Sequence, residues 1–485
     1  MPLATITIAQ ALRKLRMKEC SAQELALACI DRIEAMNPTL NAVVHTNFER
    51  ALEQAKNIDA SGGTSLPLGG IPYLAKDVFC EAGVPTTACS NILRNKTYTP
   101  PFDSTTTKRL TAAGAISLGK ANTDEFTMGS STETSCYGVT RNPWDVTRVA
   151  GGSSGGSAAG VAADMGLFAL GTDTGGSIRE PSAFCNCTGL RPTYGRTSRF
   201  GVMSMASSLD TIGPICKTVE DIALVMNVIA GKDPLDGTTV DKPVPDHTKV
   251  LTGNVKGMKI GLPKEYFIEG LNPEIETSVH EAVAILKDLG ATITEISLPH
   301  SAYATATYYV LCPCEVSSNM ARYDGIRFGH TVDKPASLTD YYGRVRSEGF
   351  GSEVKRRIMI GTYALSSGYY DAYYRQAQKV RTLIRQDFNT AFRDVDIIAA
   401  PVTPNPAFTI GIHDNDPIAM YLEDIFLVGQ VMAGIPAMSV PCGFTKTGLP
   451  LGLQLMGAQW SEELVLRCAH AYEQATRFFE KKPAL

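Results

Sequence analysis

Two glycine- and serine-rich segments contain the side chains best suited to nucleophilic chemistry. The first, GGSSGGSAAG, covers residues 151–160, and the second, GTDTGGSIREPSAF, begins at Gly171. Ser177 follows two glycines and precedes an expected helix start, so the backbone N–H groups of residues 174–177 could converge on one oxygen. The pattern predicts an oxyanion hole at Thr174, Gly175 and Gly176, beside Ser177 as the candidate nucleophile.

Two alternative roles for residues 151–160 fit the sequence less well. A flexible linker would continue into spacer residues, whereas this segment leads into VAADMGLFALGTD, an apolar helix-then-strand pattern. A phosphate-binding loop needs Lys and then Ser or Thr after its last glycine, but Ser157 and Ala158 follow Gly156. The GxxxxGK match at residues 114–121 lacks the hydroxyl that would hold magnesium.

A nucleophilic serine needs a general base, and the usual one is histidine. No histidine lies between His45 and His247, although a distant one could fold into the site. Lysine is the alternative. Lys76 ends the apolar run GGIPYLAK, where burial would depress its pKa and leave the amine neutral at pH 7. Most lysines are solvated, but the strand expected to carry Lys76 is otherwise apolar.

Taken together, these three elements resemble the amidase signature family of serine amidohydrolases, which use a Ser, cis-Ser, Lys triad. Ser153 and Ser177 are 24 residues apart, as in that family. The resemblance implies that Ser177 forms an acyl-enzyme and that Lys76 is the base. It also implies that Ser153 follows a cis peptide after Gly152 and relays a proton between Lys76 and Ser177.

Further polar side chains of the two segments are expected to support the fold. Ser154 and Ser157 would satisfy backbone groups, and Asp173 would pair with Arg179 beside the nucleophile. A role for this pair in substrate binding is the weaker alternative.

Additional segments narrow the activity that the resemblance implies. Four of them are similar to the glutamine-hydrolysing members of this family that work in bacterial tRNA-dependent amidotransferases: FTMGSSTETSCYGVTRNPWD, SSNMARYDGIRFG, EVKRRIMIGTYALSSGYYDAYYRQAQKVRTLI and PVTPNPAF. The similarity covers nearly all of residues 1–485. It implies that Ser177 takes the side-chain acyl group of glutamine, that ammonia passes to a partner subunit, and that water releases glutamate.

The same resemblance assigns residues to the glutamine itself, whose carboxylate needs a cation and whose ammonium needs an anion. Arg357 is assigned to the carboxylate and Asp424 to the ammonium, with Tyr308 and Ser130 along the side chain. Arg356 is the rival of Arg357. Without the resemblance, an arginine in KRR could belong to a solvated helix face, and Asp424 could cap a helix.

Partners also follow from the resemblance. It implies a heterotrimer with amidotransferase subunits B and C, in which the partner binds ATP and magnesium and presents the aminoacyl-tRNA. Glu-tRNA(Gln) is the expected amide acceptor, with Asp-tRNA(Asn) left open. A net charge of −4 fits this division, since tRNA binding needs clustered Lys and Arg.

This chain is expected to hold no cofactor and no metal. Its tightest cysteine pairs, Cys185 with Cys187 and Cys312 with Cys314, lack CxxC spacing and nearby histidines, so buried thiols are expected. The main alternative function is a stand-alone serine amidase for a small aryl or aliphatic amide, with an apolar acyl pocket. A degenerate scaffold subunit is a third hypothesis, and the intact triad argues against it.

Short apolar runs alternating with amphipathic segments predict an α/β fold, a sheet with helices on both faces. The resemblance specifies the amidase signature fold, with a large mixed central sheet. One domain over residues 1–485 is expected, with helices of residues 1–60 packed on it and a surface loop at 231–257. The second of these helices is expected to end at Asn37 and Pro38. The predicted strands are residues 69–79, 114–121, 166–173, 258–263, 396–402 and 437–444.

The composition, 44% hydrophobic and 19% charged, is that of a globular protein. No apolar run approaches the roughly 18 residues of a membrane span, and the first residues lack the layout of a signal peptide. Thr7 with Gln10, and Ser21 with Glu24, instead predict capping boxes that open two helices. The sequence therefore predicts a cytoplasmic protein without a membrane contact.

Overall fold

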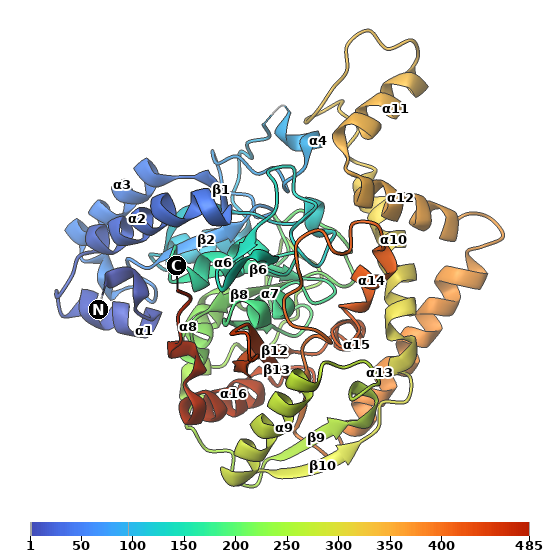
Figure 1. Cartoon of the computed structure of the whole chain (residues 1–485). Coiled ribbons are helices and arrows are strands. Elements are labelled where there is room, and N and C mark those ends of the chain that lie inside the picture. Colours follow the sequence, from blue (N-terminus) through green and yellow to red (C-terminus); the bar gives the residue numbers. More distant parts are fainter. Residues whose placement is uncertain (1, 96, 485) are drawn as a thin grey trace.

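A large mixed sheet forms the centre of the molecule in the computed structural model, which describes residues 2–95 and 97–484. Within these ranges eleven strands are joined in the order β1-β3-β2-β6-β8-β7-β12-β13-β11-β9-β10, and helices lie on both faces of the sheet (Figure 1). The expected fold class is confirmed. The strands of this sheet are β1 (Val43–Thr46), β2 (Pro72–Lys76), β3 (Ile116–Ala121), β6 (Phe168–Asp173), β7 (Thr188–Arg191), β8 (Thr211–Cys216), β9 (Lys259–Pro263), β10 (Thr292–Ile296), β11 (Ile397–Pro401), β12 (Ala437–Phe444) and β13 (Pro450–Gly457). A separate pair consists of β4 (Arg141–Asn142) and β5 (Asp145–Val149).

Strands β2, β3 and β6 run parallel to one another near one end of the sheet order. All their residues are buried, which explains why their sequences are continuous apolar runs rather than alternating ones. Because parallel strands end at the same edge, Lys76 at the end of β2 lies beside the residues that close β6. The register of the sheet thus joins Lys76 to the segment that contains Ser177.

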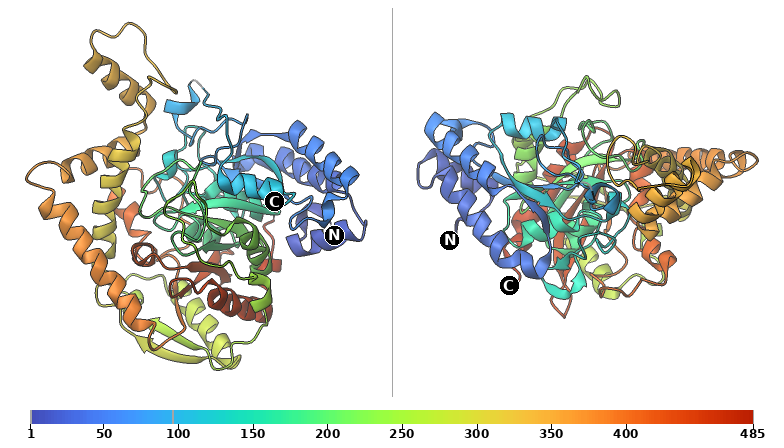
Figure 2. Two further views of the ribbon diagram at one scale, coloured as in Figure 1. Left: turned by 180° about the vertical axis from the view of Figure 1, so that it is seen from behind. Right: turned by 90° about the horizontal axis from the view of Figure 1, so that it is seen from above.

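Helices surround this sheet, and α10 to α13 lie together along one side of it (Figures 1 and 2). A π-helical turn at Asp371–Arg375 leads into α13. The helices are α1 (Ile8–Arg16), α2 (Ala22–Leu40), α3 (Phe48–Ser61), α4 (Asn91–Arg94), α5 (Thr105–Ala112), α6 (Gly155–Ala162), α7 (Arg179–Phe184), α8 (Val219–Ile229), α9 (Pro273–Asp288), α10 (Ala304–Met320), α11 (Leu338–Gly349), α12 (Ser352–Ala364), α13 (Gln376–Ala391), α14 (Pro417–Leu422), α15 (Val428–Ala433) and α16 (Glu462–Thr476).

The six predicted strands are confirmed as β2, β3, β6, β9, β11 and β12. Both predicted capping boxes, at Thr7 and Ser21, are also present. Between α8 and β9 the chain is a loop with one short 3-10 turn at His247–Val250. Every cysteine in the described structure is a free thiol, and all except Cys136 are buried. In the described ranges, none of the helices combines the length and hydropathy that crossing a bilayer requires.

Two predictions for the first 60 residues were wrong. Helix α2 continues through Pro38 to Leu40, because a proline in the last turn removes a single backbone bond. The Asn37 side chain instead accepts from the N–H groups of Ala42 and Val43, both at 2.8 Å, and guides the chain out of the helix. The second error is that only helices were expected over residues 1–60, whereas the chain next forms the strand β1. This four-residue edge strand is mostly not buried and therefore has no apolar pattern.

Candidate active site

Lys76 is buried among hydroxyl groups. Its Nζ lies 2.7 Å from Ser153 Oγ, 2.8 Å from Ser154 Oγ and 2.9 Å from Thr172 Oγ1. No ion pair joins Lys76 to a carboxylate in the described part of the chain. Burial has the largest effect on this amine and lowers its pKa from 10.5 to about 7. A substantial fraction of Lys76 is therefore neutral near pH 7.

The hydroxyl partners of Lys76 differ in their remaining bonds. Ser154 Oγ donates to the Thr172 carbonyl at 3.3 Å. Ser153 Oγ has no second hydrogen-bond partner among the described side chains and backbone groups. A neutral amine has two N–H donors and one lone pair, so one of the three hydroxyls must donate to it. In the described structure Ser153 and Thr172 both have hydroxyls free to do so, because neither has another hydrogen-bond partner. The predicted relay passes protons between Lys76 and Ser153.

The segment 151–160 is part of the buried fold, which excludes a linker. The Gly152–Ser153 peptide is cis, as expected. A Cβ on Gly152 would overlap the Asp124 carboxylate, so only glycine permits this close approach. The Ser154 N–H donates to the Ser177 carbonyl at 3.2 Å and ties the two glycine-rich segments together. Ser157 Oγ donates to the Leu170 carbonyl at 2.9 Å, which is the backbone role expected for it.

Ser177 lies in a buried turn with unused backbone donors. Within the described coordinates, the N–H groups of residues 174–177 form no hydrogen bond, although these residues are buried. Thr174 Oγ1 donates to Asp210 at 2.6 Å and fixes the start of the turn. Because buried N–H groups are rarely left unpaired, these donors are available to an oxygen that develops negative charge.

The expected contact between Ser153 and Ser177 is not found: no hydrogen bond joins their hydroxyls in the residues described. In the described structure the nearest hydrogen bond between the two segments is the one that the Ser154 N–H donates to the Ser177 carbonyl. Catalytic hydrogen bonds are often long in a substrate-free enzyme and tighten in the substrate complex. The structure therefore supplies the first link of the relay, from Lys76 to Ser153, and leaves the second as a prediction.

Asp173 and Arg179 form the structural pair that the sequence predicts. Arg179 Nε and Nη2 donate to the Asp173 carboxylate at 2.9 and 3.0 Å, and both side chains are fully buried. Burial raises the pKa of Asp173, but Arg179, Arg191 and the Ile178 N–H together outweigh burial and leave that pKa below its usual value. Arg191 Nη1, 3.4 Å from the same carboxylate, adds a second cation that the sequence did not reveal.

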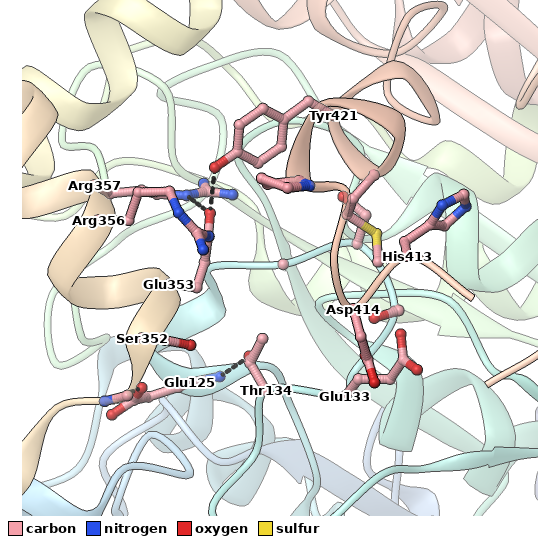
Figure 3. A pocket seen from close by; sticks show the side chains of 16 residues that line it. Glu125, Glu133, Thr134, Ser352, Glu353, Arg356, Arg357, His413, Asp414 and Tyr421 are labelled. Atoms are coloured by element: carbon pink, nitrogen blue, oxygen red, sulfur yellow. Dashed lines mark hydrogen bonds and ion pairs between the residues drawn. The ribbon is translucent and has the colours of Figure 1, made fainter. Parts of the chain in front are cut away.

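A polar cavity of about 300 Å³ lies beside these elements. It is bounded mainly by α12, α14 and the loop that contains Ser130. Polar side chains, most of them charged, occupy opposite walls of the cavity (Figure 3). One wall carries Glu353, Arg356, Arg357 and Tyr421, and the other carries Glu133, His413 and Asp414. Such a lining suits a small zwitterion better than an apolar amide.

Of the four predicted substrate residues, Ser130 and Arg357 line this cavity, whereas Asp424 and Tyr308 are not among its lining residues. The Asp424 carboxylate accepts from Ser130 Oγ at 3.1 and 3.0 Å and from Tyr309 OH at 2.8 Å. Arg357 lies over the Tyr309 ring, with 5.5 Å from its guanidinium carbon to the ring centroid. Tyr308 OH would be 2.6 Å from a Cβ on Gly175. Tyr308 therefore packs against the turn that precedes Ser177.

Arg357 and Arg356 differ in burial. Both pair with Glu353 and both line the cavity. The Arg357 side chain is 4% exposed and the Arg356 side chain 42% exposed. A guanidinium removed from water binds a carboxylate more strongly than a solvated one. Arg357 is therefore the better candidate for the carboxylate of a substrate.

The family model named Amidase matches residues 24–466, a range that includes Lys76, Ser153 and Ser177. The chain belongs to the amidase family. The A subunit of glutamyl-tRNA(Gln) amidotransferase from Geobacter metallireducens is 53% identical to this amidase over 487 residues, 100% of both chains.

Two solved structures share the fold of this amidase. In a crystal structure, the A subunit of glutamyl-tRNA(Gln) amidotransferase from Thermotoga maritima is 40% identical, with a TM-score of 0.81 over 97% of this chain and 95% of that one. A bacterial aryl acylamidase described as an amidase signature enzyme is 26% identical, with a TM-score of 0.86 over 99% of both chains. The fold is thus common to both proteins, while sequence identity is higher to the amidotransferase component.

Sequence reasoning missed several residues that hold this amidase site together. Thr172 is one residue before Asp173 at the end of β6. Because side chains alternate between the two faces of a strand, its place beside Lys76 could have been predicted. Glu353 could have been found from its i, i+4 spacing to Arg357. Tyr309 and Tyr421, whose rings lie against Arg357, have no local signal, because α10 and α14 meet only in the folded chain.

Proposed function

We propose that this amidase is the glutaminase subunit of a tRNA-dependent amidotransferase. It hydrolyses glutamine to supply ammonia for converting Glu-tRNA(Gln) to the amide form, with Asp-tRNA(Asn) left open as an acceptor. Two observations carry the proposal: Arg357 and Ser130 line a charged cavity, with the Ser130 hydroxyl donating to Asp424, and the turn that contains Ser177 has unused backbone donors. Identity of 53% to the A subunit of a glutamyl-tRNA(Gln) amidotransferase supports it.

Acylation begins when Ser177 Oγ attacks the side-chain amide carbon of glutamine. The hydroxyl proton of Ser177 passes to Ser153 Oγ, while Ser153 gives its own proton to neutral Lys76. The carbonyl oxygen becomes an oxyanion and accepts from the N–H groups of residues 174–177. Lys76 then returns a proton through Ser153 to the amide nitrogen, and the carbon–nitrogen bond breaks. Ammonia departs, and the glutamyl group remains bound to Ser177 as an ester.

Deacylation repeats these transfers with water in place of Ser177. Water attacks the ester carbon while its proton passes through Ser153 to Lys76, and the same N–H groups hold the second oxyanion. The ester bond breaks, Ser177 regains its proton, and glutamate is released. One glutamine and one water thus give one glutamate and one ammonia.

The charged cavity favours glutamine over the alternative substrate class. Arg357 would bind the α-carboxylate and Asp424 the α-ammonium, with Ser130 and Tyr308 along the side chain. Ser130 and Tyr309 already donate to Asp424 and hold it in place. A stand-alone amidase for aryl or aliphatic amides would need an apolar acyl pocket, whereas the lining of this cavity contains the charged pair of Arg357 and Glu353.

Partner subunits B and C would complete the enzyme in the cytoplasm. The partner would bind ATP, magnesium and the aminoacyl-tRNA, and residues 1–485 would act as one amidase domain. In water at pH 7 ammonia is mostly protonated and no longer nucleophilic, so its release must be coupled to the partner's activated acyl group.

The test of this proposal measures glutamine hydrolysis and transamidation by the purified chain, with and without subunits B and C, ATP and aminoacyl-tRNA. Slow hydrolysis by the chain alone, rising when the complex forms, is the expected result. Full-rate hydrolysis of glutamine or an aryl amide that no partner affects would favour the stand-alone amidase.

The pH profile of glutamine hydrolysis should follow the protonation of Lys76. The base must be neutral, and its pKa is lowered to about 7, so kcat/KM should fall about tenfold per pH unit below pH 7. Burial raises the pKa of Asp424 to about 6, so loss of this anion should steepen the decline below pH 6. A profile that stays flat from pH 6 to 9 would contradict the role of Lys76.

Arg357→Lys should raise the KM for glutamine by about tenfold, since a lysine keeps the charge but loses the fork that binds a carboxylate through two bonds. Steady-state kinetics on folded protein, checked by thermal unfolding, measures this change. Arg356→Lys is the matched control and should change KM by less than about threefold. A larger effect of Arg356→Lys would reverse the assignment.

A further inference from the structure

The second half of α12 and the connection from it to α13 carry an exposed group of large apolar side chains, here termed the tyrosine patch. Each member is at least 39% exposed, and Met359 reaches 72%. The connection forms the tip of a projection that points away from the central sheet (Figures 1 and 2). The tyrosine patch consists of Met359, Ile360, Tyr363, Tyr369, Tyr370 and Tyr373.

The tyrosine rings of the patch are packed against one another. The ring centroids of Tyr363 and Tyr369 are 4.4 Å apart, and that of Tyr373 lies 6.1 and 6.0 Å from them. Rings ordered in this way lose little conformational entropy when a partner covers them. Tyrosine and methionine are enriched in protein interfaces, and contiguous exposed apolar surface marks an interaction site. The patch has the chemistry of a protein docking surface.

Basic residues outnumber acidic ones in the stretch of sequence that contains most of the tyrosine patch. Residues 355–385 contain seven Lys or Arg and one Asp or Glu, in a chain whose net charge is −4. The cations of this stretch that face solvent and form no ion pair in the described structure are Lys379 and Arg385. Because charges across an interface are complementary, the partner must present acidic groups around an apolar centre.

Two different occupants fit these observations less well. A second copy of the chain, related by twofold symmetry, would place the same basic residues against each other. An RNA would need open ring faces for stacking and free cations for phosphates. Here Tyr363 and Tyr369 cover each other, and Arg356 and Arg375 already pair with Glu353 and Asp371.

We propose that the tyrosine patch docks an acidic face of a partner subunit in the amidotransferase complex. This proposal rests on the proposed function and names the surface through which the partner reaches the glutaminase. The contact includes Met359, Ile360 and Tyr363 in the second half of α12, and the first half of the same helix lines the substrate cavity.

Helix α12 links the docking surface to the substrate site. Arg357 faces the cavity, and Tyr363 lies on the exposed side of the same helix. At Gly361, a Cβ would overlap the Pro313 carbonyl, so α12 touches the backbone of α10. α10 in turn carries Tyr309, which contacts Arg357. A partner bound to the exposed side therefore fixes the position of Arg357 and promotes glutamine binding.

The experiment compares the wild-type chain with Tyr363→Ala/Tyr369→Ala and with Lys379→Glu. Binding to purified subunits B and C of the same organism is measured by titration, and glutaminase activity is measured with and without them. Leu235→Ala is the matched control, because Leu235 is 63% exposed in the loop after α8. Thermal unfolding checks that each variant is folded, and binding of tRNA to the free chain is measured in parallel.

The tyrosine variant should weaken partner binding at least tenfold, since truncating central interface tyrosines has effects of that size. Its basal glutaminase activity should stay within about twofold of wild type, and more partner should be needed for stimulation. Lys379→Glu should weaken binding most at low salt. Unchanged partner affinity in both variants, or a loss confined to tRNA binding, would overturn the docking proposal while leaving the glutaminase intact. Failure of the wild-type chain to bind either subunit would overturn the proposed function as well.

Discussion

Ser177→Ala is expected to lower glutamine turnover by on the order of 10⁶-fold, because loss of a serine nucleophile removes the covalent route entirely. The substitution removes one oxygen from a turn that Thr174 and the backbone hold, so the fold should persist. The measurement is glutamate release by the complete complex, alongside thermal unfolding.

Ser157→Ala is the control for Ser177→Ala, because Ser157 lies in the other glycine-rich segment and bonds only to a backbone carbonyl. Its loss should reduce stability by about 1 kcal/mol and leave turnover within a few-fold of wild type. Comparable turnover by Ser177→Ala and Ser157→Ala would refute the assignment of the nucleophile.

Lys76→Ala is expected to be nearly as severe as Ser177→Ala. The amine is the only group within hydrogen-bonding distance of Ser153 Oγ in the described structure, so without it the relay has no base. Members of a catalytic triad act as a unit, and their losses do not add. The Lys76→Ala/Ser177→Ala double variant should therefore be no slower than Ser177→Ala alone.

Removing Lys76 also leaves a buried space beside three hydroxyls. Lys76→Met fills most of that volume without a base, and it should be as inactive as Lys76→Ala while unfolding at a higher temperature. Recovery of turnover in Lys76→Met would show that packing, rather than proton transfer, accounts for the loss.

The sequence predicts the contact between Lys76 and Ser153 and the cis peptide before Ser153, because their determinants are local. Lys76 ends a buried strand, and the glycines around Ser153 and Ser177 permit close backbone approach, which residue types alone reveal. The parallel pairing of β2 with β6 then brings these segments together. The absent hydrogen bond between Ser153 and Ser177 in the described residues depends on side-chain positions that no sequence pattern encodes.

The substrate cavity is less accessible to sequence reasoning. Ser130 donates to Asp424 across 294 residues, and the rings around Arg357 come from α10 and α14. Such contacts depend on how distant helices pack, so only the resemblance to the family supplied them. The wrong end predicted for α2 has a different origin, since the local effect of Pro38 was overestimated in the final turn.

The most direct test of the account is a rapid-quench experiment on the complete complex with glutamine. Peptide mass spectrometry should find a γ-glutamyl ester on Ser177, and hydroxylamine should divert it to the hydroxamate. The ester should be absent from Ser177→Ala. Sustained glutamine hydrolysis by the wild-type complex with no ester on Ser177, or with the ester on Ser153 instead, would contradict the account.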